Sequence, residues 1–290
     1  LDRGEITLDT MVTGTAHAAS MGGTQIWLKE GEQLSLDEML KAIAVGSAND
    51  CAVAVAEHLC GSEESFVGLM NQRAKELGCT ATTFVNANGL DADGQKTLTS
   101  ARDLALISAE LLKHPKILDY TTIWMDTIRN GQFSLANTNK MLRSYQGLIG
   151  LKTGYISQAG FCISAAAQRD GMTLIATVMG APTKENRMAD ATALLNYGFA
   201  NFTPYTPDLT QALNPIPVRM GKAETVSVQA EQVPPVVVAK ESLERVSTKI
   251  DLPEMLEAPV AAGQELGTAQ VCDGDKVLFT LRLTAGESVD

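Results

Sequence analysis

Two short apolar runs separated by a two-residue turn are the feature that most constrains the fold of this chain. The runs cover residues 161–169 (FCISAAAQR) and 172–180 (MTLIATVMG), and Asp170-Gly171 lies between them. Aspartate followed by glycine favours the tight turn that joins neighbouring antiparallel strands. A further strand-like run, LIGLKT, begins at Leu148. The sequence therefore predicts an antiparallel sheet late in the chain.

The first part of the chain has helical spacing. Ser35 and Glu38 have the spacing of a capping box, which predicts that a helix begins there. Gly46-Ser47 interrupts the apolar pattern, so a break between two helices is expected at that point. The other helices predicted from spacing and caps cover residues 48–59, 62–78, 99–115 and 184–199.

The composition changes again after residue 202. Residues 203–217 are rich in proline and indicate a linker, and the runs that follow are short, β-type and separated by turn residues. We therefore expect an α+β fold. Residues 1–202 would form a domain of helices and an antiparallel sheet, and residues 205–290 would form a small, mostly β domain.

Charge and cysteine content exclude several classes of protein. The net charge of −11 argues against a nucleic-acid partner, because phosphate binding needs a basic face. Five cysteines without a CxxC pair argue against both a zinc site and a disulfide framework. No apolar run approaches the ~18 residues of a membrane span. We expect no metal and no cofactor.

Lys152-Thr153-Gly154 stands at the end of a strand-like run. A lysine there could simply protect an exposed sheet edge against aggregation. A functional interpretation is that an extended peptide adds to this strand. Gly154 would then allow close approach of a ligand backbone, and Lys152 with Thr153 would offer a cation and a hydroxyl to an anion.

Ser47-Ala48-Asn49 lies at the predicted break between helices. Serine and asparagine are common helix N-caps, which is the simpler interpretation of this tripeptide. The tripeptide precedes Lys152-Thr153-Gly154 by about a hundred residues. Serine enzymes that bind penicillin combine S-x-x-K, S-x-N and K-T-G in that order.

The chain thus resembles the low-molecular-mass penicillin-binding proteins that are D-alanyl-D-alanine carboxypeptidases. Three segments outside the motifs carry the same resemblance, together with the β-rich tail: residues 22–58, 84–105 and 187–202. The resemblance implies a β-lactamase/transpeptidase-like domain. It also implies removal of the terminal D-alanine from peptidoglycan stem peptides through an acyl-enzyme, with β-lactams as inhibitors.

The resemblance assigns roles to individual residues. Ser47 would relay protons, and Lys152 would supply positive charge beside it. Asn49 would hydrogen-bond the substrate's amide backbone. Thr153 would bind the terminal carboxylate, with Gly154 next to it. Arg187 matches a family arginine that supports carboxylate recognition.

Two departures from the family pattern stand out. No serine in the sequence is followed by lysine three positions later, so the nucleophile and its base are absent from these residues. The family's spacing places them some twenty residues before Leu1. We expect an upstream extension with a signal peptide and S-x-x-K, and an amphipathic anchor after Asp290. Asn88 is the second departure, because many relatives carry histidine there.

These departures leave several expectations and two alternatives. The protein would act outside the cytoplasm, in the cell envelope. These residues alone would be inactive, and they would be stable only with the upstream segment or as an assembly covered by a partner. A class A-like β-lactamase is one alternative, but Thr192 stands where the glutamate of its E-x-x-L-N segment would be. A catalytically inactive scaffold that binds the cell wall is the other.

Overall fold

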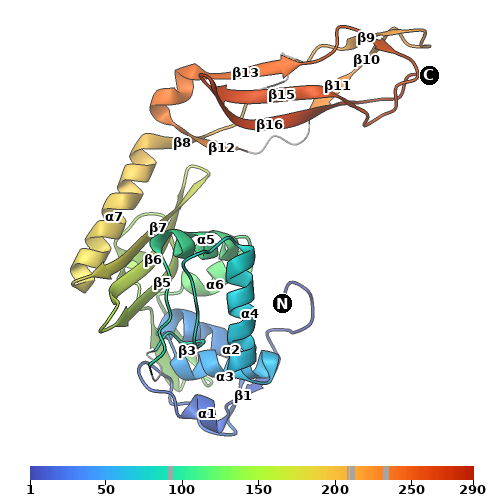
Figure 1. Ribbon diagram of the computed structural model, residues 1–290. Coiled ribbons are helices and arrows are strands. Elements are labelled where there is room, and N and C mark those ends of the chain that lie inside the picture. The colour runs from blue at the N-terminus through green and yellow to red at the C-terminus, as the bar shows by residue number, and fades with distance from the viewer. Residues whose placement is uncertain (91–93, 208, 210–212, 231–234) are drawn as a thin grey trace. The chain divides into compact units, whose positions relative to one another are not determined.

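The computed structural model describes residues 1–90, 94–207, 209, 213–230 and 235–290 (Figure 1). These residues form two compact units, 1–197 and 198–290. Parts of three predicted segments lie outside the described residues. They are the family-like stretch at 91–93, the linker at 208 and 210–212, and the β-type runs at 231–234.

Three helices of the first unit, α2 (Leu36–Lys41), α4 (Glu63–Glu76) and α5 (Ala101–Leu111), begin at serine caps. The Glu38 backbone N–H donates to Ser35 Oγ (3.2 Å), and the Asp103 N–H donates to Ser100 Oγ (3.1 Å). Both predicted helix starts are therefore confirmed. The main α-helices are α1 (Ala16–Ala19), α2 (Leu36–Lys41), α3 (Asn49–Cys60), α4 (Glu63–Glu76), α5 (Ala101–Leu111), α6 (Leu118–Thr121) and α7 (Lys184–Asn201). Short helical turns are η1 (Ala42–Gly46), η2 (Pro115–Ile117) and η3 (Lys140–Arg143).

The helix α3 lies at the centre of the apolar core. Val53 and Ala54 on α3 are fully buried, as are Met39 on α2 and Val45 in η1. Two antiparallel pairs border this helical core. They are β1 (Met11–Thr13) with β2 (Gln33–Ser35), and β3 (Met125–Ile128) with β4 (Phe133–Ala136).

A three-stranded antiparallel sheet completes the first unit. Its order is β5 (Leu148–Ile156), β6 (Gly160–Arg169) and β7 (Met172–Ala181). Asp170 and Gly171 form the β6–β7 turn with φ of 49° and 74°, as the sequence predicted. Figure 1 shows α5 and α7 on opposite faces of this sheet. The β5 strand, which carries Lys152-Thr153-Gly154, is an edge strand among the described residues.

The second unit is built of strands, which confirms the predicted small β-rich domain. One sheet has the order β11-β16-β15-β13, and a smaller one has the order β10-β9-β14. Their bounds are β9 (Ile216–Arg219), β10 (Thr225–Val226), β11 (Val228–Ala230), β13 (Val246–Asp251), β14 (Leu256–Glu257), β15 (Glu265–Asp273) and β16 (Lys276–Ala285). A 3₁₀ turn, η4 (Lys240–Arg245), precedes β13. Val226 and Leu283 are fully buried in its core.

The predicted linker is wrong at its beginning. Phe202–Tyr205 forms strand β8, which pairs antiparallel with β12 (Val236–Ala239). Proline has no backbone N–H to donate to a strand ladder. Pro204 is accommodated because this sheet has only two strands, so each strand has one edge that forms no ladder hydrogen bonds. The domain boundary predicted at 202–205 stays a prediction. Among the described residues, no helix has both the length and the apolar character of a membrane span.

Candidate active site

The backbone around Ser47 presents two polar side chains instead of using them as caps. The π-helical turn η1 ends at Ser47, whose φ of 63° and ψ of 40° are left-handed. Ala48 is the N-cap residue of α3 and makes no side-chain capping bond. The interpretation of this tripeptide as a capping segment is therefore wrong, and the side chains of Ser47 and Asn49 are available for other contacts.

The structure brings Ser47 and Lys152 together. Lys152 Nζ donates to Ser47 Oγ (2.7 Å) and to the Thr153 carbonyl (2.9 Å). Burial of the Lys152 ammonium lowers its pKa to about 8, and the charge of Arg187 acts in the same direction. A lysine with this pKa is close to the protonation balance that proton transfer near neutral pH requires.

Thr153 and Gly154 provide a hydroxyl and open space on the same strand. Thr153 is buried, with only 8% of its surface exposed, and its Oγ1 lies 2.7 Å from Thr138 Oγ1. No atom lies within 4 Å of the place that a Cβ at Gly154 would occupy. The edge of β5 is therefore accessible at Gly154 to an incoming chain.

Arg187 is a buried cation with an unfilled hydrogen-bonding position. Its side chain is 6% exposed, and its Nη1 donates to the Cys162 carbonyl (3.3 Å), opposite Gly154 in the β5–β6 register. The Nε of Arg187 has no partner. Burial lowers the pKa of the guanidinium. An unpartnered buried donor on a cation is costly, and an anion would relieve that cost.

Sequence reasoning missed a buried carboxylate beside Asn49. Asp50 is completely buried and accepts hydrogen bonds from the backbone N–H groups of Ile26 (3.1 Å) and Leu28 (2.9 Å). The one available signal was its position in the first turn of α3, where the helix dipole favours an anion. Asp50 fixes residues 22–28 against the turn at Ser47.

The same segment orients the Asn49 amide. Asn49 Nδ2 donates to the Gly22 carbonyl (2.9 Å), and the Asn49 backbone N–H donates to the Thr24 carbonyl (2.8 Å). A Cβ at Gly23 would lie 2.8 Å from Asn49 Nδ2, so the backbone approaches the amide too closely for any other residue. The Oδ1 of Asn49 and its second N–H stay available for a ligand.

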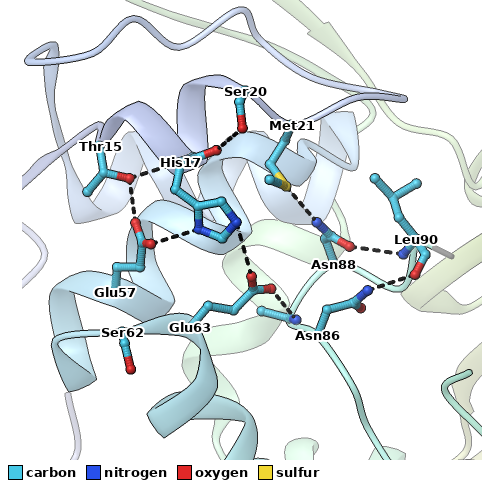
Figure 2. Close-up of polar contacts among 12 residues, drawn as sticks. Thr15, His17, Ser20, Met21, Glu57, Ser62, Glu63, Asn86, Asn88 and Leu90 are labelled. Carbon is cyan, nitrogen blue, oxygen red and sulfur yellow. Dashed lines mark hydrogen bonds and ion pairs between the residues drawn. The ribbon is translucent and has the colours of Figure 1, made fainter. Parts of the chain in front are cut away.

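Asn88 contacts the far end of this segment. Asn88 Nδ2 donates to Met21 Sδ (3.2 Å), and its Oδ1 accepts from the Leu90 N–H (2.9 Å), as Figure 2 shows. Both contacts are drawn beside His17, whose Nδ1 lies 2.9 Å from Glu57 Oε1. Asn88 thus lies against Met21, the residue before Gly22. These hydrogen bonds of Asn88 do not involve Ser47 or Lys152.

Comparison with known families identifies the family to which the chain belongs. Residues 1–183 match the family model for D-alanyl-D-alanine carboxypeptidase, and residues 199–290 match the model for the C-terminal domain of penicillin-binding protein 5. The chain belongs to the D-alanyl-D-alanine carboxypeptidase family, a family of serine hydrolases. This membership favours neither the β-lactamase nor the inactive scaffold.

Individual relatives agree with the family assignment. The D-alanyl-D-alanine carboxypeptidase DacF of Bacillus subtilis is 37% identical over 294 aligned residues, which cover 100% of this chain and 75% of DacF. Penicillin-binding protein 5 of Haemophilus influenzae has a TM-score of 0.82 at 29% identity, covering 100% of this chain and 85% of that one. Penicillin-binding protein D2 of Listeria monocytogenes, solved with ampicillin bound, has a TM-score of 0.62 at 34% identity, and the match covers 68% of this chain and 80% of that one.

Proposed function

We propose that this protein removes the terminal D-alanine from peptidoglycan stem peptides, and that residues 152–154 and Arg187 bind the free carboxylate of that residue. The observation that carries this proposal is the pair of cations on the β5 side, the buried Arg187 and the partly buried Lys152. Lys152 and Arg187 are close enough for the charge of Arg187 to lower the pKa of Lys152, and the Nε of Arg187 has no partner. Two adjacent cations and a threonine hydroxyl form a site that an anion stabilises.

A carboxylate recognised in this way determines which bond is cut. The terminal residue would lie along the edge of β5, with its carboxylate at Thr153 and its backbone passing over Gly154. Asn49 belongs to the α3 wall of the site (residues 47–50), whereas the β5 wall consists of residues 152–154 and Arg187. Asn49 would accept a hydrogen bond from the amide of the preceding residue or donate one to it. The scissile bond then lies between the two walls, near Ser47 and Lys152.

Ser47 and Lys152 would move the proton that acyl transfer requires. A nucleophilic serine adds to the carbonyl of the penultimate residue, the C–N bond breaks, and the departing D-alanine takes up a proton. The Lys152 ammonium can donate to Ser47, and the Ser47 hydroxyl can pass a proton to the leaving amine. Water then cleaves the ester and restores the serine.

We further propose that the nucleophile and its lysine base come from an S-x-x-K segment outside these 290 residues. The sequence contains no serine with a lysine three positions later. Sequencing the gene upstream of the codon for Leu1 checks this point directly. An in-frame stop codon immediately upstream, followed by a start codon near Leu1, would contradict it.

Inhibition by β-lactams and a place in the cell envelope are parts of the same proposal. The ampicillin complex of the Listeria relative supports the first. In the full-length gene product, a labelled penicillin should form a stable acyl-enzyme that replacement of the upstream serine abolishes. A fusion of the gene's upstream region to a reporter that is active only outside the cytoplasm tests the second.

The sharpest test of carboxylate recognition is Thr153→Val in the full-length protein. Valine keeps the shape and deletes the hydroxyl, so transition-state stabilisation should fall by about 1.5–3 kcal/mol for peptides with a free terminal carboxylate. The loss should shrink for the same peptides with an amidated terminus, because the amide removes the charge. Equal losses for both peptides would remove the carboxylate-binding role of Thr153.

A further inference from the structure

Trp27 has an unusual combination of exposure and backbone conformation. Its side chain is 67% exposed, although both neighbours, Ile26 and Leu28, are almost fully buried. Its φ of 56° is left-handed, a conformation that glycine adopts freely and bulky residues rarely adopt. Singly exposed apolar side chains are ordinary, but an aromatic held at positive φ requires surrounding structure that over-determines it.

The surrounding structure does over-determine this residue. Asp50 accepts hydrogen bonds from the backbone N–H groups of Ile26 and Leu28, so the backbone is fixed on each side of Trp27. Arg129 Nη1 donates to the Ile26 carbonyl (2.8 Å). With both flanking side chains buried in the core, the indole can point only towards solvent.

The indole is also supported from behind. The Trp27 ring packs edge-on against Phe133 on β4, with ring centroids 6.0 Å apart and an interplanar angle of 64°. The guanidinium of Arg129 lies over the same Phe133 ring, 5.4 Å from its centroid, and is held by Glu32. Trp27 is therefore a rigid, solvent-facing aromatic on a fixed base.

Its position connects it to the site. The segment that carries Trp27 is the one whose Gly22 and Thr24 carbonyls hold Asn49. Trp27 follows Thr24 by three residues in this segment, so the glycan attached to a stem peptide held at Asn49 could lie along it. An aromatic face presents negative charge density, and the C–H groups on the face of a pyranose ring carry a small positive charge, so the two stack.

We infer that Trp27 is a binding subsite for a sugar ring of the glycan to which the stem peptide is attached. This inference rests on the proposed function, because peptidoglycan is the ligand that joins a sugar to a D-Ala-D-Ala peptide. It extends that function from the peptide to the glycan. The left-handed backbone at Trp27 is the conformation that keeps the ring exposed on the segment that also holds Asn49.

The test compares two ligands on the full-length gene product, a disaccharide pentapeptide and the same pentapeptide without sugar. Trp27→Gly should raise KM for the disaccharide pentapeptide roughly tenfold, the effect of losing one ring-stacking contact. KM for the sugar-free peptide should stay within about twofold. Tyr197→Ala, which removes another exposed aromatic, is the matched control and should change neither value.

A second variant separates binding from folding. Trp27→Ala keeps the unfavourable positive φ, whereas glycine adopts it without steric cost, so the alanine variant should have the lower Tm of the two. Both variants should show the same loss of sugar-dependent affinity, and Trp27→Phe should restore part of it. An equal rise in KM for both ligands, or no rise for either, would overturn the sugar subsite.

A direct binding measurement keeps the inference separate from catalysis. The fluorescence of the wild-type protein minus that of Trp27→Gly reports on Trp27 alone. Titration with the disaccharide that carries no peptide should quench or shift this difference spectrum. No change would overturn the inference even if the peptidase is active, and a change with an inactive protein would leave the subsite intact while the proposed function fails.

Discussion

The two walls of the site are stabilised in opposite ways. On the α3 side, the Asp50 carboxylate, the Asn49 backbone N–H and the Asn49 amide are hydrogen-bonded to residues 22–28. On the β5 side, the buried Arg187 lies close enough to Lys152 for its charge to lower the pKa of Lys152, and Arg187 Nε has no partner. The first wall is held in place by its own hydrogen bonds, whereas the second keeps a buried donor, Arg187 Nε, without a partner.

This difference separates two tasks that a carboxypeptidase site must perform. The hydrogen-bonded wall fixes the orientation of Asn49 before substrate arrives, so no free energy is spent on ordering it. An unpartnered buried donor on one of two neighbouring cations is an unfavourable arrangement that a substrate carboxylate would relieve, so the proposed site would favour ligands that end in a charged group. The following predictions test this contrast, beginning with the largest expected effect.

Removal of Lys152 should have the largest effect, because in the proposed function Lys152 serves both carboxylate binding and proton transfer. In the full-length protein, Lys152→Ala should lower kcat/KM by on the order of a thousandfold, about 4 kcal/mol, for carboxylate and amide peptides alike. Steady-state kinetics on the same peptide with a free and with an amidated terminus measure this loss in kcat/KM. The exposed Lys140 supplies the control, since Lys140→Ala should leave both values within about twofold. A loss confined to the carboxylate peptide would remove Lys152 from the proton path.

The contrast between the walls predicts opposite changes in stability for Asp50 and Arg187. Asp50→Asn places an amide N–H₂ among backbone donors, so the free energy of unfolding should fall by about 2–4 kcal/mol. Arg187→Met removes a buried charge with an unfilled donor, so stability should stay constant or rise by about 1 kcal/mol while carboxylate affinity falls. Denaturant unfolding of the full-length variants decides between these outcomes.

A second buried carboxylate provides the control for Asp50. Asp103 is 1% exposed and accepts from the Ala81 N–H (2.8 Å) and the Thr82 hydroxyl (2.8 Å). Asp103→Asn should destabilise the protein to a similar degree but leave KM for both peptides unchanged. If Arg187→Met destabilised the protein as much as Asp50→Asn does, the two walls would not differ as described.

The sequence predicted the elements with local signals and missed the contacts that depend on tertiary structure. Ser35, Ser100 and Asp170-Gly171 act within a few residues of the backbone they shape, and each prediction was confirmed. The pairing of β8 with β12 joins segments more than thirty residues apart, and Pro204 made that region resemble a linker.

The same distinction applies to the site. Ser47 and Lys152 could be found because their tripeptides occur in a known order, and the structure places them in contact. Asp50 and Trp27 could not be found, because residues 22–28 have no regular period and their conformation is set by hydrogen bonds to α3 and Arg129. Thr138 was missed for a similar reason, since a single hydroxyl in a loop gives no pattern.

The lowered pKa of Lys152 predicts that the free energy of unfolding changes with pH by about 3 kcal/mol. The unfolded side chain titrates at 10.5 and the folded one at about 8, so between these values the unfolded state binds more protons. The free energy of unfolding should therefore rise with pH across this window, by about 3 kcal/mol in all. Lys152→Met should remove this rise, and affinity for a carboxylate peptide should fall in the wild type as Lys152 loses its charge.

Lys41 offers a control of opposite sign. The hydrogen bond from Lys41 to Asp37 raises the pKa of Lys41 above 10.5, against the effect of partial burial. Its contribution to stability is complete below the unfolded pKa and is lost as pH rises through the folded value. Lys41→Met should therefore lower stability at pH 8 and leave the Lys152-dependent rise in place. An unchanged profile in Lys152→Met would show that another group is responsible.

The smallest expected effect concerns Thr138, which touches the β5 wall without lining the open space at Gly154. Its hydroxyl lies 2.7 Å from that of Thr153, and one of the two must donate to the other. If Thr138 orients the Thr153 hydroxyl, Thr138→Val should weaken carboxylate recognition by about 1 kcal/mol, roughly fivefold in kcat/KM, and Thr138→Ser should restore it. A double-mutant cycle with Thr153→Val measures the coupling, because Thr138 can have no further effect once the Thr153 hydroxyl is gone. Additive losses would show that Thr138 acts on stability or on another contact, and the β5 wall would then bind the carboxylate without an oriented hydroxyl.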